Sequence, residues 1–173
     1  MNTADQTKKD HEIVEFVEFT FDQSQYGVSV DQVSEIIMCR DTIVPFPDAA
    51  ESITGVINLR GTIVPIVDLS FYVNSQKLGA AANGALIIII EYETFLVGFR
   101  VNAVSCIQRV AAQAIDTTYE QIQSKHGYAY GVARIDEKII FLLDFVAIVE
   151  AIGMTKIKNI KKNATENESP NAG

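Results

Sequence analysis

Histidine side chains are the first candidates for chemistry in this sequence. His11 and His126 are its two histidines, and either could act as a general base near neutral pH. Both lie in polar stretches, whereas a catalytic base is usually held by a rigid element. A surface role is therefore favoured for each, and an enzymatic alternative stays open only if His126 approaches Asp116 or Glu120.

Two aspartates could in principle form a carboxylate pair for acid–base catalysis. Asp68 and Asp144 each end an apolar run and precede a helix-like segment, where an aspartate caps free backbone N–H groups. Capping is the favoured interpretation. The sequence also has no glycine-rich nucleotide-binding motif, no zinc-protease motif and no nucleophile elbow. We therefore expect a protein that is not an enzyme and has no catalytic residue or cofactor.

The cysteines do not suggest a metal site. Cys39 and Cys106 are far apart and form no CxxC motif, whereas structural zinc needs about four Cys or His ligands in paired spacing. We expect two reduced thiols, buried or half-buried, and no bound metal.

Arg60 has a place that suggests binding. It lies between an apolar strand and Gly61, where a tight turn is expected. Its stem could be buried while its guanidinium bonds loop carbonyls, or it could be a fixed polar anchor in a binding groove. The two roles are compatible.

The stretch around Arg60 belongs to an internal repeat. Residues 55–69 return in weaker form as residues 131–145, and residues 30–36 return as residues 101–107, in the same order. Within each pair the interval is constant. The chain is therefore expected to hold two similar β units in tandem.

The elements that must position these residues are mostly strands. Alternating or continuous apolar runs bounded by turn residues predict strands over 13–21, 26–30, 55–60, 62–68, 86–92, 95–101, 104–110, 131–135 and 138–143. Helical patterns are few. They predict one turn over 48–51, a piece near 119–122, and a helix over 144–152 that Asp144 caps and Gly153 ends. The fold class is mainly β, and short strands with frequent turns favour small barrels.

Polar segments mark the boundaries. Residues 1–12 and 154–173 are predicted to be polar disordered tails, and the second tail carries a lysine cluster, Lys156, Lys158, Lys161 and Lys162. Residues 74–84 are small and polar, as in a linker. The folded part should span 13–153, with a first barrel over about 13–73 and a second over about 85–153, although the barrels could exchange chain segments.

Composition narrows the class of protein. The chain has 173 residues, of which 48% are hydrophobic, and a net charge of −8. This apolar content supports a packed core, while the negative charge argues against binding nucleic acid or an anionic membrane surface. The N-terminus has no apolar signal segment, and the longest apolar run, residues 85–90, is too short to span a bilayer. A cytosolic protein is expected.

With these residues in view, the chain resembles the CheW family of bacterial chemotaxis coupling proteins over about residues 14–152. The most specific strings are Gly55–Gly61 followed by Val64–Leu69, supported by Tyr26–Val30 and Val33–Ile36. In the second half Val97-Gly98, Val101, Val104-Ser105 and Gly131 also match. Asn102, where the family often has aspartate, and Arg100, in a usually apolar strand, depart from the family pattern.

The resemblance implies a fold and a role. The fold would be two five-stranded barrels of the Src-homology-3 type around a shared core, with a few short helices. The protein would be a scaffold adaptor that couples the cytoplasmic tips of transmembrane chemoreceptors to the regulatory domain of the histidine kinase CheA. It would be cytoplasmic, recruited to membrane-bound receptor arrays without inserting into the membrane, and able to self-associate in array rings. The alternative is a CheW-like adaptor in a non-motility chemosensory pathway, or a kinase-type regulatory module with another partner.

The resemblance also implies site residues. Receptor or kinase binding carries over to Val33, Glu35, Ile43, Gly55 and Arg60 in the first unit, and to Gly98, Val101, Val104 and Ile107 in the second. Apolar members would bury the aliphatic face of a helical hairpin, and Arg60 with Glu35 would set its register. Core packing is the competing explanation for each valine.

Overall fold

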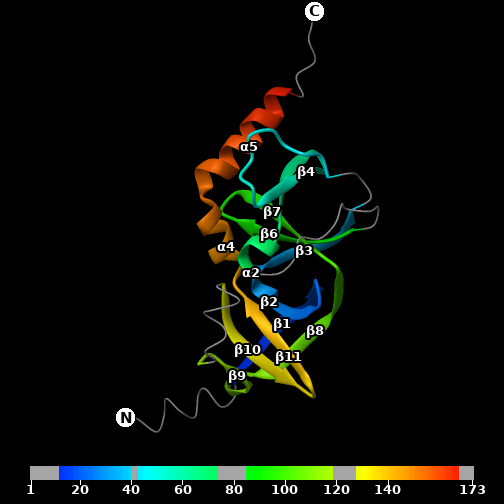
Figure 1. Ribbon diagram of the computed structural model, residues 1–173, viewed down its shortest axis with the longest axis vertical. Helices are drawn as coiled ribbons and strands as arrows, with labels where there is room; N and C mark the ends of the chain where they lie inside the picture. Colours follow the sequence, from blue (N-terminus) through cyan, green and yellow to red (C-terminus); the bar gives the residue numbers. More distant parts are fainter. Residues whose placement is uncertain (1–11, 40–42, 74–84, 119–127, 168–173) are drawn as a thin grey trace, which may run out of the picture.

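The computed structural model describes residues 12–39, 43–73, 85–118 and 128–167. Two β-sheets follow one another along the long axis of the molecule, and two helices, α4 and α5, lie along one side (Figure 1). This arrangement confirms the mainly β fold class. Within the described residues, no helix has both the length and the apolar character needed to cross a lipid bilayer.

Strands make up most of the described chain. Their bounds are β1 Ile13–Phe21, β2 Ser24–Ser29, β3 Val33–Cys39, β4 Ile53–Leu59, β5 Thr62–Val67, β6 Ala85–Tyr92, β7 Phe95–Val101, β8 Ala103–Ala111, β9 Ile115–Asp116, β10 Ala129–Ile135 and β11 Lys138–Leu143. The helices are short 3₁₀ turns, η1 at Val30–Gln32 and η2 at Ala112–Ala114, and the α-helices α2 Ser70–Val73, α4 Phe145–Ile152 and α5 Met154–Asn167.

The strands form two sheets, each of which contains strands from both halves of the chain. A six-stranded sheet has the order β8-β1-β2-β11-β10-β9, and a five-stranded sheet has the order β3-β6-β7-β5-β4. We call them sheet A and sheet B. The division into 13–73 and 85–153 therefore describes the two repeats and not the two sheets, because segments are exchanged between them. The first two strands of the chain belong to sheet A, whereas β3 to β5 belong to sheet B.

The repeat is visible in this exchange. Replacing the first five strands of sheet A by their repeat counterparts turns the order β8-β1-β2-β11-β10 into β3-β6-β7-β5-β4, the order of sheet B. The hairpins β4–β5 and β10–β11 both shift register next to a glycine, Gly55 in one and Gly131 in the other. Each is followed by a parallel pairing, β5 with β7 and β11 with β2.

Three clusters of buried side chains form the core. The largest is shared between the sheets and α4, while smaller ones fill the inside of sheet B and of sheet A. Phe145 of α4 joins the parts of the shared core. Its ring stacks on Phe99 of sheet B at 3.9 Å between centroids and meets Phe19 of sheet A at 5.7 Å.

Helix α4 begins and ends as predicted. Asp144 accepts a hydrogen bond from the backbone N–H of Ala147 at 3.0 Å, and Gly153 follows the last residue with φ of 89°, a conformation that glycine adopts without strain. The capping role assigned to Asp144 is confirmed.

The prediction of a disordered tail from residue 154 is wrong over residues 154–167, which form α5. Ile157 and Ile160 are buried in the shared core, and the ammonium of Lys158 lies over the Phe95 ring, 5.7 Å from its centroid. These two isoleucines, three positions apart, lie on one face of the helix and pack it against the core. The polar composition of the segment concealed this stripe. The predicted disorder of residues 1–11 and 168–173 lies outside the described residues.

Residues 48–51 form no helical turn. The backbone N–H of Ala49 bonds the carbonyl of Phe46 at 3.4 Å, and Asp48 has φ of 59°. Pro47 followed by a residue with positive φ is the pattern of a type II turn. Asp48 is therefore a turn residue and not a helix cap. The helical piece predicted near residues 119–122 lies outside the described residues.

Candidate functional site

The structure brings two of the predicted site residues into direct contact. Arg60 donates two hydrogen bonds to Glu35, from Nη1 to Oε1 at 3.2 Å and from Nη2 to Oε2 at 3.0 Å. A two-point guanidinium–carboxylate contact fixes both orientation and distance. The Arg60 side chain is 76% exposed and that of Glu35 27%, so the pair is a surface feature that presents both signs of charge.

The turn that carries Arg60 explains its position. Leu59 pairs with Thr62 across the β4–β5 hairpin, so Arg60 and Gly61 alone form the turn. Both have positive φ, 53° and 84°, which matches the two-residue turns that suit the strand twist. The Gly61 N–H donates to the Asn58 side chain at 2.8 Å. The guanidinium is thus held out over edge strand β3, where Glu35 lies.

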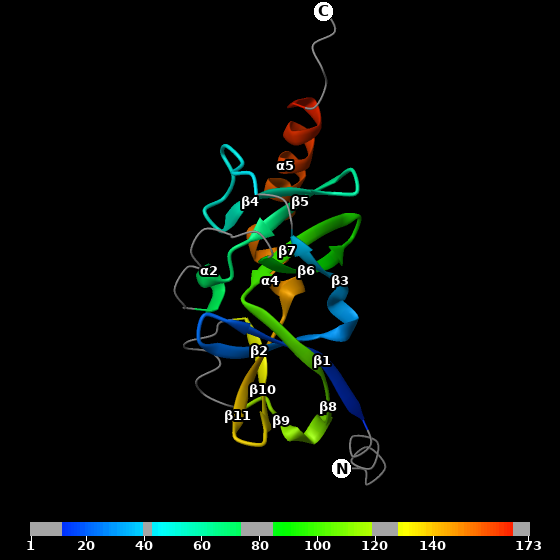
Figure 2. The same ribbon diagram turned by 90° about the vertical axis from the view of Figure 1, so that its right-hand side faces the viewer.

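The edge strands β3 and β8 both carry apolar side chains that are exposed or half-buried. We define the inter-sheet patch by its members Val33, Ile36, Met38, Val104 and Ile107. Val33 and Val104 are half-buried against the shared core, while Ile36, Met38 and Ile107 are 40%, 60% and 58% exposed. Figures 1 and 2 place β3 and β8 on the same side of the molecule. Exposed aliphatic side chains in such numbers mark a surface suited to a protein partner.

Sequence reasoning selected only part of this patch. Ile36 and Met38 were missed, although a signal for Ile36 was present. Ile36 stands in the first repeat where Ile107 stands in the second, as Val33 corresponds to Val104. The repeat therefore places equivalent apolar residues on both edge strands. Met38 has no such signal, because its exposure depends on β3 being the edge of sheet B.

Ile43 and Gly55 are buried inside the structure and are not part of its surface. Ile43 is buried inside sheet B. A Cβ added at Gly55 would lie 2.3 Å from the carbonyl oxygen of Val44, because Val44 and Val56 pair backbone to backbone there. A side chain cannot fit at so close an approach. Both residues pack at the hairpin that carries Arg60, and their role in binding stays a prediction.

Gly98 and Val101 are also internal. A Cβ at Gly98 would lie 2.6 Å from Cδ1 of Ile66 and 2.8 Å from Cγ2 of Ile87. Val101 is buried in the shared core. The competing explanation of core packing therefore accounts for these two positions, and their role in binding stays a prediction.

A buried carboxylate lies elsewhere in sheet A. Glu18 is fully buried and accepts from Nε2 of Gln108 at 2.6 Å and from Nζ of Lys138 at 3.2 Å. Burial alone would raise the pKa of Glu18, but the bonds from Gln108 and Lys138 outweigh it, and the pKa is lowered from 4.5. An ionised, fully bonded carboxylate is suited to structure and not to proton transfer.

The remaining candidates for chemistry do not assemble. Asp68 accepts from the Ser70 N–H at 2.9 Å, so both aspartates cap helix starts as predicted. His11, His126 and Glu120 lie outside the described residues. Among the residues that the structure describes, no group of three or more His, Cys, Asp or Glu side chains could hold a metal ion.

The cysteine prediction is wrong for one residue. Cys106 was expected to be buried or half-buried, but it is exposed. It lies on edge strand β8, where β8 has an extra residue relative to β1, and its thiol points toward Gln108 and Glu18.

Fold and site together define a class of protein. It is built from two Src-homology-3-like sheets with a shared core, and its surface carries exposed aliphatic side chains on β3 and β8 and a two-point ion pair on β3 and the β4–β5 turn. A surface of this kind is suited to contact with another protein.

Comparison with known proteins identifies the family. The family description "CheW-like domain" matches residues 15–153. The chemotaxis protein CheW of Klebsiella aerogenes is 28% identical over 150 residues, 86% of this chain and 89% of the relative. The chemotaxis protein CheW of Thermotoga maritima is 29% identical over 143 residues, which are 80% of this chain and 89% of the relative. The crystal structure of the scaffolding protein TtCheW from Thermoanaerobacter tengcongensis gives a TM-score of 0.66 at 27% identity, over 77% of this chain and 85% of that one. The chain belongs to the CheW family.

Proposed function

We propose that this protein is a non-enzymatic scaffold adaptor that couples transmembrane chemoreceptors to the histidine kinase CheA. It acts in the cytoplasm and is recruited to receptor arrays by the partners it binds. The family membership supports a chemotaxis role, and the matched structure is that of a scaffolding protein.

The observation that carries the proposal is the combination of the inter-sheet patch with the Arg60–Glu35 pair. A receptor tip that folds as a helical hairpin presents an apolar stripe on each helix, and such a stripe docks into an apolar groove. Exposed Ile36, Met38 and Ile107 supply apolar surface on two different strands. Charged groups at the edge of an apolar contact fix register and exclude wrong partners, which is the role we assign to Arg60 and Glu35.

The proposal can be tested by NMR. Isotope-labelled protein is titrated separately with a receptor-tip hairpin fragment and with the regulatory domain of the CheA-like kinase. We expect each partner to shift a distinct set of signals, and one set to include Val33, Glu35 and Arg60. Absence of any shift with either partner would remove the chemotaxis coupling role and leave the fold unchanged.

A matched pair of variants shows whether binding depends on the inter-sheet patch or on any exposed apolar side chain. Ile107→Ser removes an exposed isoleucine from the patch, and Ile139→Ser removes one that is 46% exposed on β11, outside the patch. We expect the first variant to weaken binding of the hairpin fragment by roughly tenfold, about 1.4 kcal/mol, and the second to leave it unchanged. Equal losses in both variants would show that the patch is not the binding surface.

A further inference from the structure

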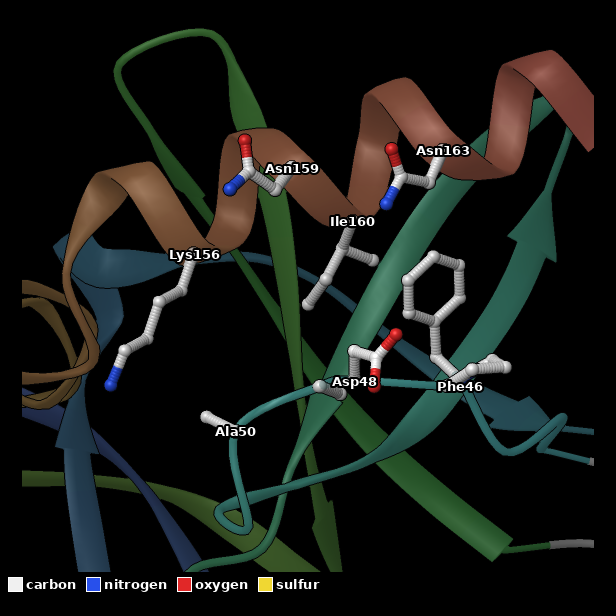
Figure 3. Close-up of a pocket in the computed structure, with 9 residues that line it drawn as sticks. Phe46, Asp48, Ala50, Lys156, Asn159, Ile160 and Asn163 are labelled. Atoms are coloured by element: carbon white, nitrogen blue, oxygen red, sulfur yellow. The ribbon is translucent and has the colours of Figure 1, made fainter.

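The hollow between α5 and the loop before β4 is a feature of the exposed surface (Figure 3). Ile160, which lines it, is already buried in the shared core. The polar side chains around Ile160 are exposed, namely Asp48, Asn159 and Asn163. The hollow shares no residue with the inter-sheet patch, and it therefore has no part in shaping that patch.

The two halves of the inter-sheet patch lie on strands that directly follow crossings between the sheets. Among the strands that the structure describes, the chain passes from sheet A to sheet B between β2 and β3, and returns to sheet A between β7 and β8 (Figure 2). The 3₁₀ turn η1 forms the first crossing and Asn102 the second. The contacts that hold these crossings therefore decide where β3 and β8 place the patch.

Gln32, the last residue of η1, holds the first crossing. Its Nε2 donates to Oδ1 of Asp144 at 3.0 Å, and its Oε1 accepts from the backbone N–H of Phe145 at 2.9 Å. We call this two-bond contact the amide bridge. Since Nε2 can only donate and Oε1 can only accept, one orientation of the amide satisfies both bonds. The bridge ties the start of β3 to the point where the chain leaves β11 of sheet A for α4.

The amide bridge also completes the cap of α4. The first N–H groups of a helix have no partner within the helix. The Asp144 side chain accepts from the N–H of Ala147, and Gln32 accepts from that of Phe145. The Phe145 ring in turn contacts both sheets in the shared core. The bridge therefore joins the first crossing to the residue that links the sheets.

The pairing of β3 with β6 is irregular directly after η1. Val33 pairs with Ile90. Glu35 pairs with Ile89, so Ser34 is an extra residue in β3 and the register shifts. A bulge of this kind bends the strand and changes the direction of its side chains. The pairing with β6 alone therefore leaves the start of β3 less firmly fixed, and the amide bridge on η1 supplies a constraint from the other side.

The second crossing is held by different contacts. The N–H of Asn102 donates to the carbonyl of Thr20 at 2.9 Å, and its side-chain oxygen accepts from the Asp22 N–H at 2.7 Å. Both partners belong to the β1–β2 hairpin, so these bonds hold β8 to sheet A. Ala103 stands in the second repeat where the first has Gln32, and alanine has no polar side chain. The amide bridge therefore belongs to the crossing that leads into β3.

We propose that Gln32 is a positioning residue for the binding surface on β3. By bonding the cap of α4 it fixes the bulged start of the strand, and so sets how Val33 and Glu35 meet a partner. The inference rests on the proposed function, because it names a residue that shapes the site through which that function would act.

An exchange of donor and acceptor tests the amide bridge. Gln32→Glu keeps the size of the side chain, but it removes the donor and places a second carboxylate beside Asp144. Adding Asp144→Asn restores a donor on the opposite side of the contact, and asparagine caps a helix as well as aspartate does. In titration calorimetry near neutral pH, we expect Gln32→Glu to weaken binding of the receptor-tip hairpin fragment by roughly fivefold. The double variant should recover most of that loss.

Affinity separates positioning from stability, because a change in stability alone does not alter the affinity of a folded protein. Each variant is measured as the full chain at a temperature where circular dichroism shows it to be folded. Ile140→Val is the matched control, since it shortens a buried side chain in the separate cluster inside sheet A. It should lower the Tm and leave the affinity unchanged. The proposal is overturned if Gln32→Glu behaves like this control, or if the double variant binds no better than Gln32→Glu.

The free protein gives a readout that needs no partner. We expect Gln32→Glu to shift the backbone amide signals of Glu35 and Ile36 in NMR spectra, and the double variant to return them toward their original positions. If the unmodified protein binds neither the hairpin fragment nor the kinase domain, the proposed function fails, and these signals alone judge the role of Gln32. Signals that move and return would uphold the positioning of β3, and unmoved signals would overturn it.

Discussion

Arg60 is a surface residue that we propose acts in binding and contributes little to folding. Its contact with Glu35 is two-pointed, but the guanidinium is mostly exposed. Exposed ion pairs contribute only about 0–1 kcal/mol to stability, because solvent screens them. The pair is therefore better explained by what it presents to a partner than by what it holds together.

A charge exchange tests this explanation. Arg60→Glu should change the free energy of unfolding by less than about 1 kcal/mol and weaken partner binding at least tenfold. Adding Glu35→Arg restores a pair with the charges reversed, so part of the affinity should return if the fixed geometry matters. Urea unfolding and titration calorimetry with the kinase regulatory domain measure the two effects. A large loss of stability with intact binding would contradict the assignment.

Glu18 is the opposite case, a charged residue whose burial gives it a structural role. Its pKa is lowered in the folded state by Gln108 and Lys138 despite burial. A lowered carboxyl pKa stabilises the protein above the pKa of the unfolded chain, and this contribution is lost as the pH falls through the folded pKa.

We therefore expect Glu18→Gln to lower the free energy of unfolding by roughly 1–3 kcal/mol near neutral pH. Its stability should also fall less steeply than that of the unmodified protein between about pH 5 and pH 3. Urea unfolding across this range measures both. The control Glu137→Gln, an exposed carboxylate on the β10–β11 turn, should change neither. Parallel pH profiles for all three proteins would show that Glu18 does not carry the effect.

The two departures from the family pattern also have physical explanations at this scale. Asn102 accepts a hydrogen bond from the Asp22 N–H at 2.7 Å through its side-chain oxygen, and an aspartate would accept the same bond. Arg100 is buried on β7, and burial lowers its pKa while nearby Asp68 opposes that shift. An acidic neighbour makes an arginine tolerable in an otherwise apolar strand.

At the scale of elements, α5 is the part that sequence reasoning missed. Its mean composition is polar, and composition was the basis on which residues 154–173 were assigned to a tail. The helix is held by tertiary packing of a narrow stripe, which no local average detects.

Shortening a buried side chain of that stripe should lower the free energy of unfolding. Ile157 is 1% exposed in the shared core, so Ile157→Ala should lower the free energy of unfolding by about 2–5 kcal/mol. Lys162→Ala on the exposed face should change it by less than about 0.5 kcal/mol. Chemical denaturation of both variants measures these changes in the free energy of unfolding. Equal, small effects would mean that α5 is dispensable.

Strands and caps could be predicted because they rest on local signals. The hairpin turn at Arg60-Gly61, the cap at Asp144 and the stop at Gly153 all follow from residue type and spacing. The pairing of β3 with β6, and of β8 with β1, could not, because it joins strands from different repeats through long-range contacts. For the same reason the exposure of Met38 and the burial of Ile43 were not foreseen.

At the scale of the whole molecule, the two sheets share one core, and we therefore expect them to unfold as one cooperative unit. The Phe145 ring contacts Phe99 of sheet B and Phe19 of sheet A. Phe145→Ala should therefore cost about 3–5 kcal/mol and lower the stability of both sheets together. Hydrogen exchange measured on amides of β2 and β7 should show equal losses of protection. A loss confined to one sheet would show that the sheets unfold separately.

The exchange of strands between repeats has a consequence for the history of the molecule. A single repeat on its own would hold two strands of one sheet and three of the other, so two identical chains would be the smallest assembly that completes both. The present chain is equivalent to such a swapped homodimer joined end to end. Two halves of one chain can differ in sequence, whereas two identical chains cannot. Here Cys106 and Asp136 stand in the second repeat where the first repeat has Glu35 and Arg60. The two halves of the chain therefore present unequal faces, which suits the proposed role of binding two different partners.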